Sequence, residues 1–188
     1  MSAAGQCERR AEDYYITPAW MVDEFLELYL VDYSAPWTNV LDPCAGGCKN
    51  FGMPYPRALA ERRLFNVTTV DIRPDSHAEI TANYLEWHPG KLFDAIITNP
   101  PFYCSVEITE KALEDVVIGG HVIMLQRLNW IGTTKRQEFW KKAPLKHVYA
   151  HHKRAKFDPD KPNQTDSIEY AHFVFERGYS GETKFSII

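Results

Sequence analysis

The 188-residue sequence predicts an α/β fold, in which strands alternate with helices. Apolar runs with the length of buried strands end in turn residues, at 39–41, 67–71 and 93–97. Segments with apolar residues at helical spacing lie between or after them, at 18–33, 55–64 and 105–117. With 45% hydrophobic residues, a chain of this length is expected to bury one substantial core.

The carboxyl-terminal half continues the alternation. Gly119 and Gly120 are expected to break the chain before a strand at 121–125, and a helix is predicted near 135–142. Closing strands are expected at 146–150 and 168–175, on either side of a polar loop at 154–167. No internal repeat is visible. We therefore expect a flexible segment at 1–13 and a single domain at 14–188.

The charge of the chain is unevenly distributed. The net charge is −4, yet the segment 127–156 holds nine basic side chains and one acidic side chain, Glu138. This segment thus carries +8 and the remainder −12. Such a split within one domain favours a side that faces a polyanion, although a solvated helix face is the alternative for each single residue.

No apolar run approaches the ~18 residues of a membrane span, and the amino terminus is polar, so neither a span nor a signal peptide is predicted. We expect a protein of the cytoplasm that does not bind a membrane. The cysteines form no Cys-x-x-Cys pair, so reduced thiols are expected and a zinc site is not. They are Cys7, Cys44, Cys48 and Cys104.

The most informative stretch is the corner after the third strand, Asn99-Pro100-Pro101-Phe102. Neither proline offers an N–H to a neighbouring strand, and each restricts the residue before it to extended geometry. The result is a stiff turn that presents one amide side chain, unpaired backbone carbonyls and an aromatic ring. A plain strand-ending turn is the alternative.

This corner suits methyl transfer to a planar exocyclic amine, whose lone pair is delocalised into its ring. The Asn99 side-chain oxygen and the Pro100 carbonyl are each placed to accept one amino hydrogen, which favours a pyramidal, more nucleophilic nitrogen. The Phe102 ring can then face the cationic centre that forms. No metal ion is needed for this chemistry.

Three further motifs suggest a nucleoside pocket. Thr17-Pro18 has the form of a helix start, with Thr17 as N-cap and Pro18 as first helical residue. The loop 42–48 follows a strand with small residues and paired glycines, which lets a ligand approach the backbone. Asp71 ends the next strand, where an acid accepts hydrogen bonds from ribose hydroxyls in nucleoside-binding folds. A helix start and a solvated loop acid are the alternatives.

In this order, four motifs resemble those of class I S-adenosylmethionine-dependent methyltransferases of the amino-methylating type. They are Tyr-Ile-Thr-Pro (15–18), Asp-Pro-Cys-Ala-Gly-Gly (42–47), Val-Asp-Ile (70–72) and Asn-Pro-Pro-Phe (99–102). The resemblance implies a Rossmann-like, mostly parallel seven-stranded sheet, with helices on both faces and one antiparallel strand near an edge. It also implies S-adenosylmethionine as cofactor, S-adenosylhomocysteine as product and no metal.

The same resemblance assigns residues. Asn99, Pro100, Pro101 and Phe102 would form the catalytic corner. The cofactor would be held by Asn99 and by Tyr15, Thr17, Pro18, Asp42, Pro43, Ala45, Gly46, Gly47, Asp71, Ile72, Asn83, Tyr84 and Leu85. Asn83 stands where the family often has an acid, so its contact with the cofactor adenine is the weakest of these assignments.

Asn-Pro-Pro followed by Phe is similar to enzymes that form N6-methyladenine in DNA, and 130–157 resembles short phage and prophage adenine methyltransferases. DNA is therefore the expected partner, in a bacterial or phage-infected cell; RNA and protein glutamine are the alternative substrates, and a non-catalytic binding protein on this fold is a second alternative. No separate target-recognition region is apparent, which predicts relaxed or short sequence specificity. The oligomeric state is open, with a homodimer as one arrangement. The candidate nucleic-acid contacts are Arg127, Lys135, Arg136, Lys141, Arg154 and Lys156.

Overall fold

The computed structural model describes residues 15–33, 37–62, 66–157 and 167–188. The predicted flexible segment 1–13, Leu64 and most of the predicted loop at 154–167 lie outside these described residues. Within them, eight strands form one sheet in the order β3-β2-β1-β4-β5-β7-β6-β8. The strands are β1 (Asn39–Asp42), β2 (Asn66–Asp71), β3 (Ile80–Thr81), β4 (Phe93–Thr98), β5 (Val116–Arg127), β6 (Leu145–Ala150), β7 (Tyr170–Glu176) and β8 (Lys184–Ile187).

Seven of these strands run in the same direction. β7 is antiparallel to both of its neighbours, β5 and β6, and every other pairing in the sheet is parallel. This confirms the predicted α/β fold with a mostly parallel sheet and one reversed strand near an edge. The sheet has an eighth strand beyond the predicted seven, because β8 adds to the outer edge of β6.

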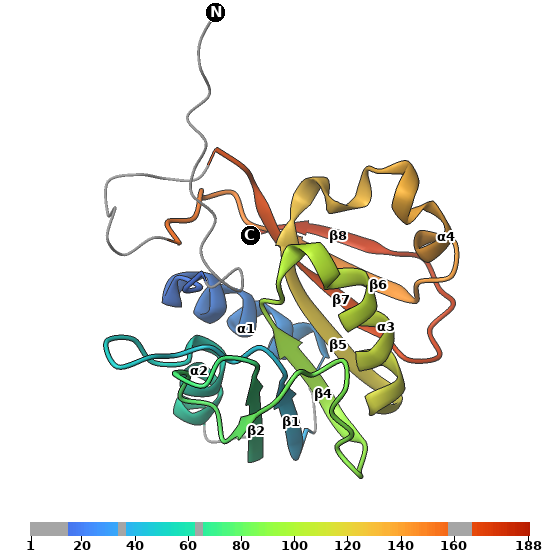
Figure 1. The fold of residues 1–188 in the computed structure, drawn as a ribbon. Coiled ribbons are helices and arrows are strands. Elements are labelled where there is room, and N and C mark those ends of the chain that lie inside the picture. The colour runs from blue at the N-terminus through green and yellow to red at the C-terminus, as the bar shows by residue number, and fades with distance from the viewer. Residues whose placement is uncertain (1–14, 34–36, 63–65, 158–166) are drawn as a thin grey trace, which may run out of the picture.

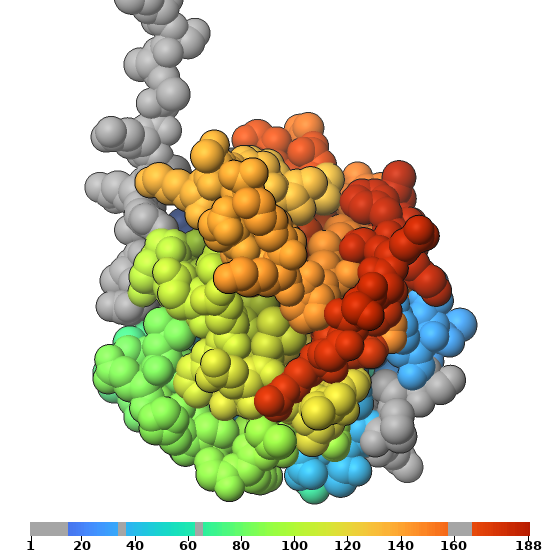
Figure 2. Space-filling view, turned by 90° about the vertical axis from the view of Figure 1, so that its right-hand side faces the viewer, coloured from blue at the N-terminus to red at the C-terminus, as the bar shows by residue number. Residues whose placement is uncertain are grey.

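Helices cover both faces of the sheet (Figure 1). The helical elements are α1 (Ala19–Tyr33), α2 (Pro54–Glu61), η2 (Phe102–Cys104), α3 (Ser105–Asp115), η3 (Leu128–Ile131), η4 (Thr134–Arg136) and α4 (Gln137–Trp140). α1 and α2 lie on one face, and α3 and α4 lie on the other, where Figure 2 shows them at the surface beside the last residues of the chain. None of the described helices is long and apolar enough to cross a membrane.

The strand sequences explain the two layers. Successive side chains of a strand point to opposite faces, so Val40 contacts the α1 and α2 layer while Leu41 contacts the α3 and α4 layer. In β4, Ala95 and Ile97 face the first layer and Ile96 the second. Because both faces are covered, these strands are apolar throughout rather than alternating.

The predicted break at Gly119 and Gly120 is wrong, since both glycines lie inside β5. Gly119 has a φ of +79°, and the pairing with β4 shifts register between Phe93 and Ala95. A Cβ on Gly120 would lie 2.9 Å from the Asp94 carbonyl oxygen. The glycines therefore allow an irregularity within a continuous strand rather than ending it.

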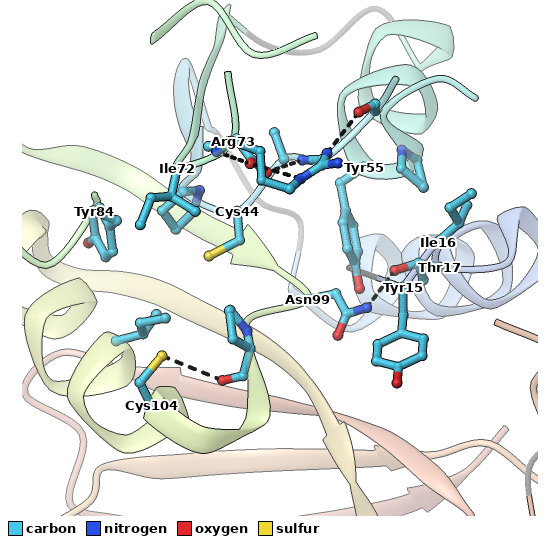
Figure 3. Close-up of a pocket in the computed structure, with 18 of the residues that line it drawn as sticks. Tyr15, Ile16, Thr17, Cys44, Tyr55, Ile72, Arg73, Tyr84, Asn99 and Cys104 are labelled. Atoms are coloured by element: carbon cyan, nitrogen blue, oxygen red, sulfur yellow. Dashed lines mark hydrogen bonds and ion pairs between the residues drawn. The ribbon is translucent and has the colours of Figure 1, made fainter. Parts of the chain in front are cut away.

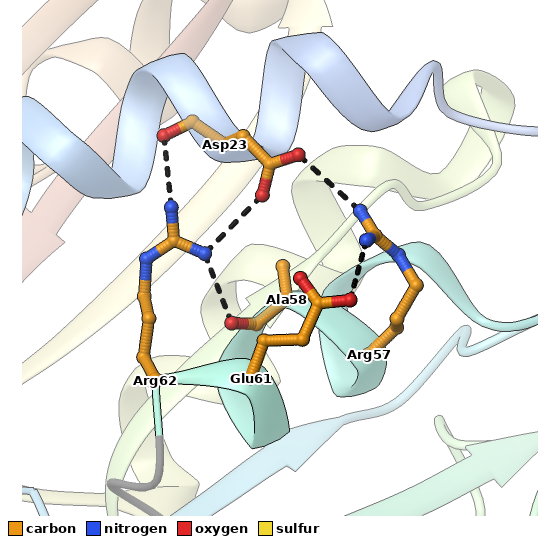
Figure 4. Close-up of polar contacts among 5 residues, drawn as sticks. All are labelled: Asp23, Arg57, Ala58, Glu61 and Arg62. Atoms are coloured by element: carbon orange, nitrogen blue, oxygen red, sulfur yellow. Dashed lines mark hydrogen bonds and ion pairs between the residues drawn. The ribbon is translucent and has the colours of Figure 1, made fainter.

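An ion-pair group joins α1 to α2 (Figure 4). Asp23 of α1 pairs with Arg57 of α2 at 3.3 Å and with Arg62 at 3.2 Å. Arg57 also pairs with Glu61 at 2.7 Å, and Arg62 donates to the Ala58 carbonyl at 3.0 Å. These pairs are partly exposed, so each stabilises the contact only weakly, but together they fix α2 against the helix that follows Thr17.

Candidate active site

A pocket opens at the carboxyl ends of β1, β2 and β4 (Figure 3). The strand order reverses direction between β1 and β4, which is where ligands bind in open α/β sheets. Thirteen of the predicted site residues line this pocket: Tyr15, Thr17, Pro43, Ala45, Gly46, Gly47, Asp71, Ile72, Asn83, Tyr84, Leu85, Asn99 and Pro101. Four others are adjacent in the chain to lining residues without being lining residues themselves: Pro18, Asp42, Pro100 and Phe102.

The glycine loop forms one wall through its backbone. Gly46 and Gly47 have φ values of 67° and 76°, which residues with a side chain rarely adopt. A Cβ on Gly47 would lie 2.9 Å from the Met53 side chain and 3.1 Å from that of His77. The wall therefore depends on glycine both for its backbone conformation and for the space beside it.

Asp71, at the end of β2, holds this loop in place. One carboxylate oxygen accepts a hydrogen bond from the Gly46 N–H at 2.8 Å, and the other accepts one from the Arg73 N–H at 2.9 Å. The Arg73 side chain in turn donates to the Gly47 carbonyl at 2.8 Å. Asp71 is 6% exposed and lines the pocket, with the half-exposed Ile72 beside it. The acid thus serves the loop and also faces the ligand space.

Asp42 lies beneath the loop rather than in the pocket wall. It is buried, and one carboxylate oxygen accepts a hydrogen bond from the Cys44 N–H at 3.3 Å. Burial raises the pKa of Asp42 from 3.8 to about 7, although the Thr98 side chain and the Cys44 N–H partly oppose the rise. This carboxyl group therefore holds its proton to a higher pH than an exposed aspartate does.

The segment Asn83-Tyr84-Leu85 forms the opposite wall. The Asn83 amide donates to Glu86 at 2.8 Å and accepts from the Leu85 N–H at 3.1 Å, so both ends of its side chain have local partners. The buried Tyr84 hydroxyl donates to Asp115 of α3 at 2.7 Å. These contacts hold the segment against α3 with Leu85 partly exposed beside the pocket.

Asn99 follows β4 at the same edge. Its amide nitrogen donates to the Thr17 hydroxyl at 3.0 Å, and its amide oxygen points away from Thr17 (Figure 3). Thr17 is 4% exposed. α1 begins at Ala19, one residue later than predicted, and Thr17 makes its hydrogen bond to Asn99 instead of acting as the predicted N-cap. With the amide nitrogen directed at Thr17, the amide oxygen is left available as an acceptor.

The rest of the corner surrounds Asn99. Pro100 is buried, Pro101 lines the pocket, and Phe102 begins the short η2 helix. The half-buried Phe102 ring lies 6.1 Å from the ring of Tyr170, measured between centroids. The Arg127 guanidinium carbon lies 5.0 Å from the centroid of the same ring. The aromatic ring is thus held between the carboxyl end of β5 and the start of β7.

Several pocket residues were not predicted. Tyr55 of α2 lines the pocket, and its hydroxyl lies 2.9 Å from Nε2 of His172. Cys44 and Cys104 line it from opposite sides, and burial raises the pKa of the Cys44 thiol well above its usual value. From helical spacing alone, Tyr55 is expected in the core. Its contact with His172 could not be predicted, because the two residues are 117 positions apart in the sequence.

The predicted basic contacts fall into two groups. Arg127 ends β5, and Arg154 and Lys156 follow β6. Because β4, β5 and β6 run in the same direction, these residues emerge at the edge that carries the pocket. Lys135 lies in η4, and Lys141 follows α4 on the face away from α1 and α2.

Three of the basic side chains already have partners within the protein. Arg136 donates to the Trp130 carbonyl at 2.8 Å, Lys141 pairs with Glu138 at 2.7 Å, and Arg154 pairs with Glu169 at 3.2 Å. Arg127, Lys135 and Lys156 are exposed. Among the described residues, no group of three His, Cys, Asp or Glu side chains is arranged to hold a metal ion.

No protein-family model and no curated protein matches the sequence, but solved structures share its fold. A methyltransferase subunit of a type I restriction-modification system from Streptococcus thermophilus superposes with a TM-score of 0.68 at 10% identity, over 92% of this chain and 47% of that chain. The N-methyltransferase NodS from Bradyrhizobium japonicum, solved with S-adenosyl-L-homocysteine, gives 0.57 at 16%, over 86% and 89%. A protein from Pyrococcus horikoshii, provisionally described as an RNA methyltransferase, gives 0.64 at 16%, over 88% and 87%.

The chain spans 65%, 48% and 47% of the lengths of three matched structures, the Streptococcus subunit among them. At these identities the likeness concerns the fold. The chain therefore has the Rossmann-like fold of class I S-adenosylmethionine-dependent methyltransferases.

Proposed function

We propose that this protein transfers a methyl group from S-adenosylmethionine to the exocyclic N6 amine of adenine in DNA. The observation that carries the proposal is the orientation of Asn99. Its amide nitrogen is occupied by Thr17, and its oxygen is left as an acceptor at the rim of the pocket. If Asn99 only ended a strand, its amide would not need a hydrogen bond to the buried Thr17 hydroxyl.

The pocket suits a nucleoside cofactor. Gly46 and Gly47 line the pocket with backbone that carries no side chain, so a ligand can approach closely there. We assign the methionine end of the cofactor to Thr17 and the glycine loop, the ribose hydroxyls to Asp71 and the adenine to Ile72. When bound, S-adenosylmethionine supplies an electrophilic methyl group on sulfur.

The Asn99 corner would act on the methyl acceptor. The Asn99 oxygen and the Pro100 carbonyl each accept one hydrogen of the target amine, which directs the nitrogen lone pair toward the cofactor side. The Phe102 ring stabilises the positive charge that develops on the amine. The amine loses one proton after transfer, and the residues on this corner need only bind and orient, so the mechanism requires no general base of unusual pKa.

The distribution of charge favours a nucleic acid as the molecule that carries the target base. Arg127, Arg154 and Lys156 emerge at the edge that carries the pocket. A base in a duplex must leave the stack to enter such a pocket, and basic side chains at its rim would then contact the flanking phosphates. DNA is our first choice because the Streptococcus neighbour belongs to a restriction-modification system.

RNA adenine is the rival substrate, and the Pyrococcus neighbour supports it. Protein glutamine remains a further alternative, because its side chain also presents a planar amide nitrogen. A non-catalytic nucleic-acid-binding protein on this fold is a third. We prefer an enzyme, because a binding protein would not need Asn99 to be oriented by Thr17. The described residues form one sheet, and we propose short or relaxed sequence specificity for this single domain.

The test is to incubate the purified protein with labelled S-adenosylmethionine and unmethylated DNA, digest the DNA and identify the modified nucleoside. We expect N6-methyladenine. Asn99→Ala should abolish transfer while cofactor binding changes little, and Asn66→Ala, at the opposite edge of the sheet, should retain activity. Label in RNA or protein but not in DNA would reject the DNA assignment. Full activity of Asn99→Ala would reject the catalytic one.

A further inference from the structure

Arg127 and Phe102 form a contact that the proposed chemistry does not use. The guanidinium carbon of Arg127 lies 5.0 Å from the centroid of the Phe102 ring, which is a cation–π distance. Phe102 also lies beside Tyr170, at 6.1 Å between ring centroids. The ring that faces the target base in our proposal is therefore already in contact with two side chains.

The fold brings these three residues together. Phe102 follows the carboxyl end of β4, Arg127 is the last residue of β5, and Tyr170 is the first residue of β7. β5 pairs with both of the other strands, and Arg127 lies directly opposite Tyr170 in the ladder. Strand register thus fixes the backbone positions of the three residues. The Arg127 guanidinium is less constrained, because it lies at the end of a long side chain.

Of the two neighbours of Phe102, Arg127 is the one that can move. Tyr170 is 2% exposed and packs in a core cluster with Met21 and Phe157. Arg127 is exposed, and none of the described carboxylates forms an ion pair with it. Arg154, at the same edge, is by contrast paired with Glu169. Among the described residues, the Arg127 guanidinium has its contact with the aromatic face of Phe102 and no ion pair.

We propose that Arg127 is a placeholder for the target base: it covers Phe102 in the free protein and moves to a backbone phosphate when nucleic acid binds. This inference rests on the proposed function. Stacking of a base on an aromatic ring is stronger than an exposed cation–π contact, so an incoming base can displace the guanidinium. The displaced guanidinium gains a bidentate partner in the phosphate, which its planar geometry fits.

The placeholder role has opposite consequences for two ligands. A free nucleoside has a base but no phosphate, so it must displace Arg127 without offering the guanidinium a new partner. DNA offers both. Removing the side chain should therefore strengthen nucleoside binding and weaken DNA binding, whereas the loss of a simple phosphate contact would weaken DNA binding alone.

The experiment compares Arg127→Ala with Lys142→Ala, a matched control that removes an exposed basic residue which follows α4 and is not among the candidate contacts. The probes are 2-aminopurine riboside, whose fluorescence falls when it stacks, and a mixed-sequence DNA duplex titrated at several salt concentrations. For Arg127→Ala we expect nucleoside binding about two- to fivefold tighter than wild type, which is the effect of losing one exposed cation–π competitor. The salt slope of DNA binding should fall by about 0.9. Lys142→Ala should leave nucleoside binding unchanged.

Unchanged or weaker nucleoside binding in Arg127→Ala would overturn the placeholder role. The absence of detectable nucleoside binding in wild type and in both variants would overturn it too. Tighter nucleoside binding in both Arg127→Ala and Lys142→Ala would also overturn it, because the effect would then come from charge alone. Methyl transfer by the wild-type protein tests the proposed function separately. DNA methylation with no change in nucleoside binding would reject the placeholder and retain the function. Tighter nucleoside binding in Arg127→Ala, without methyl transfer to DNA by the wild-type protein, would retain the placeholder and reject the proposed function.

Discussion

Replacing Thr17 by valine tests how the orientation of Asn99 is maintained. Valine keeps the shape of threonine but removes the hydroxyl that accepts the Asn99 amide hydrogen at 3.0 Å. Thr17 is 4% exposed, so water has little room to replace the lost acceptor. Without this bond the amide can rotate away from the position in which its oxygen faces the target amine in the proposed chemistry.

The magnitude follows from the single bond that is lost. A neutral hydrogen bond of this kind contributes about 0.5–1.5 kcal/mol net, which is the preference of the amide for its observed position over positions without this bond. At 25 °C that preference corresponds to about a two- to tenfold change in population. We therefore expect kcat for methyl transfer to fall about two- to tenfold in Thr17→Val. Thr17→Ser restores the hydroxyl and should recover most of the loss.

The assay is methyl transfer to DNA under saturating cofactor and DNA, with cofactor affinity measured separately by calorimetry. Orientation of the amide acts on kcat, whereas a damaged pocket would raise the dissociation constant of the cofactor. If Thr17→Val keeps wild-type kcat while Asn99→Ala is inactive, Thr17 does not orient the amide. If Thr17→Ser is as impaired as Thr17→Val, packing rather than the hydroxyl is responsible.

Three further predictions concern the pocket wall and the buried ionisable groups. Gly47→Ala should abolish cofactor binding measured by calorimetry, because the new Cβ enters occupied space at a positive φ. Gly90 also has a positive φ but nothing lies within 4 Å of its Cβ position, so Gly90→Ala is the control that reports the backbone cost alone, about 1–2 kcal/mol of unfolding free energy. Asp42→Asn should become more stable relative to wild type as pH rises from 6 to 8 in urea unfolding, since the raised pKa of Asp42 means that the buried group loses its proton over that range; a constant difference would contradict this. Burial and the nearby His151 lower the pKa of His172 well below 6.5, so below about pH 6.5 the unfolded chain takes up a proton that the folded protein cannot. In the Asp42→Asn background, which removes the opposite contribution of Asp42, the unfolding free energy should fall by up to about 1.4 kcal/mol per pH unit for each such histidine as pH is lowered; a flat profile between pH 7.5 and 5.5 would refute it.

The fold was largely predictable because its central strands are short apolar runs with clear ends. β1, β2 and β4 lie within a residue of their predicted bounds. The two-residue β3 and the edge strand β8 were missed, because neither has an apolar run: β8 reads Lys-Phe-Ser-Ile, with three of its four side chains exposed. The glycines in β5 were misread, because a bulge and a strand break have the same local sequence.

The site residues that lie at the ends of single strands were predictable from the sequence. Asp71 and Asn99 each follow an apolar strand, and parallel strands bring such ends to one edge, where the structure has the pocket. Contacts across the sheet were not predictable. The Asn99 bond to Thr17 joins residues 82 positions apart, and the Arg127 contact with Phe102 depends on the register between β4, β5 and β7.

Two neighbouring acids on α1 connect this long-range packing to the site. Asp23 binds Arg57 and Arg62, which fixes α1 to α2. Glu24 faces the opposite way and accepts a hydrogen bond from Nδ1 of His151 at 3.0 Å. A carboxylate only accepts, so His151 Nε2 accepts from Nδ1 of His172.

His172 Nε2 is then left to accept from the hydroxyl of Tyr55, which lines the pocket. Burial lowers the pKa of both histidines, which keeps them neutral and this donor order intact. α1 is thereby anchored to α2 and to the β6–β7 half of the sheet about two helical turns from Thr17. The orientation of Asn99 consequently depends on buried polar contacts between elements more than 100 residues apart, which local sequence patterns do not encode.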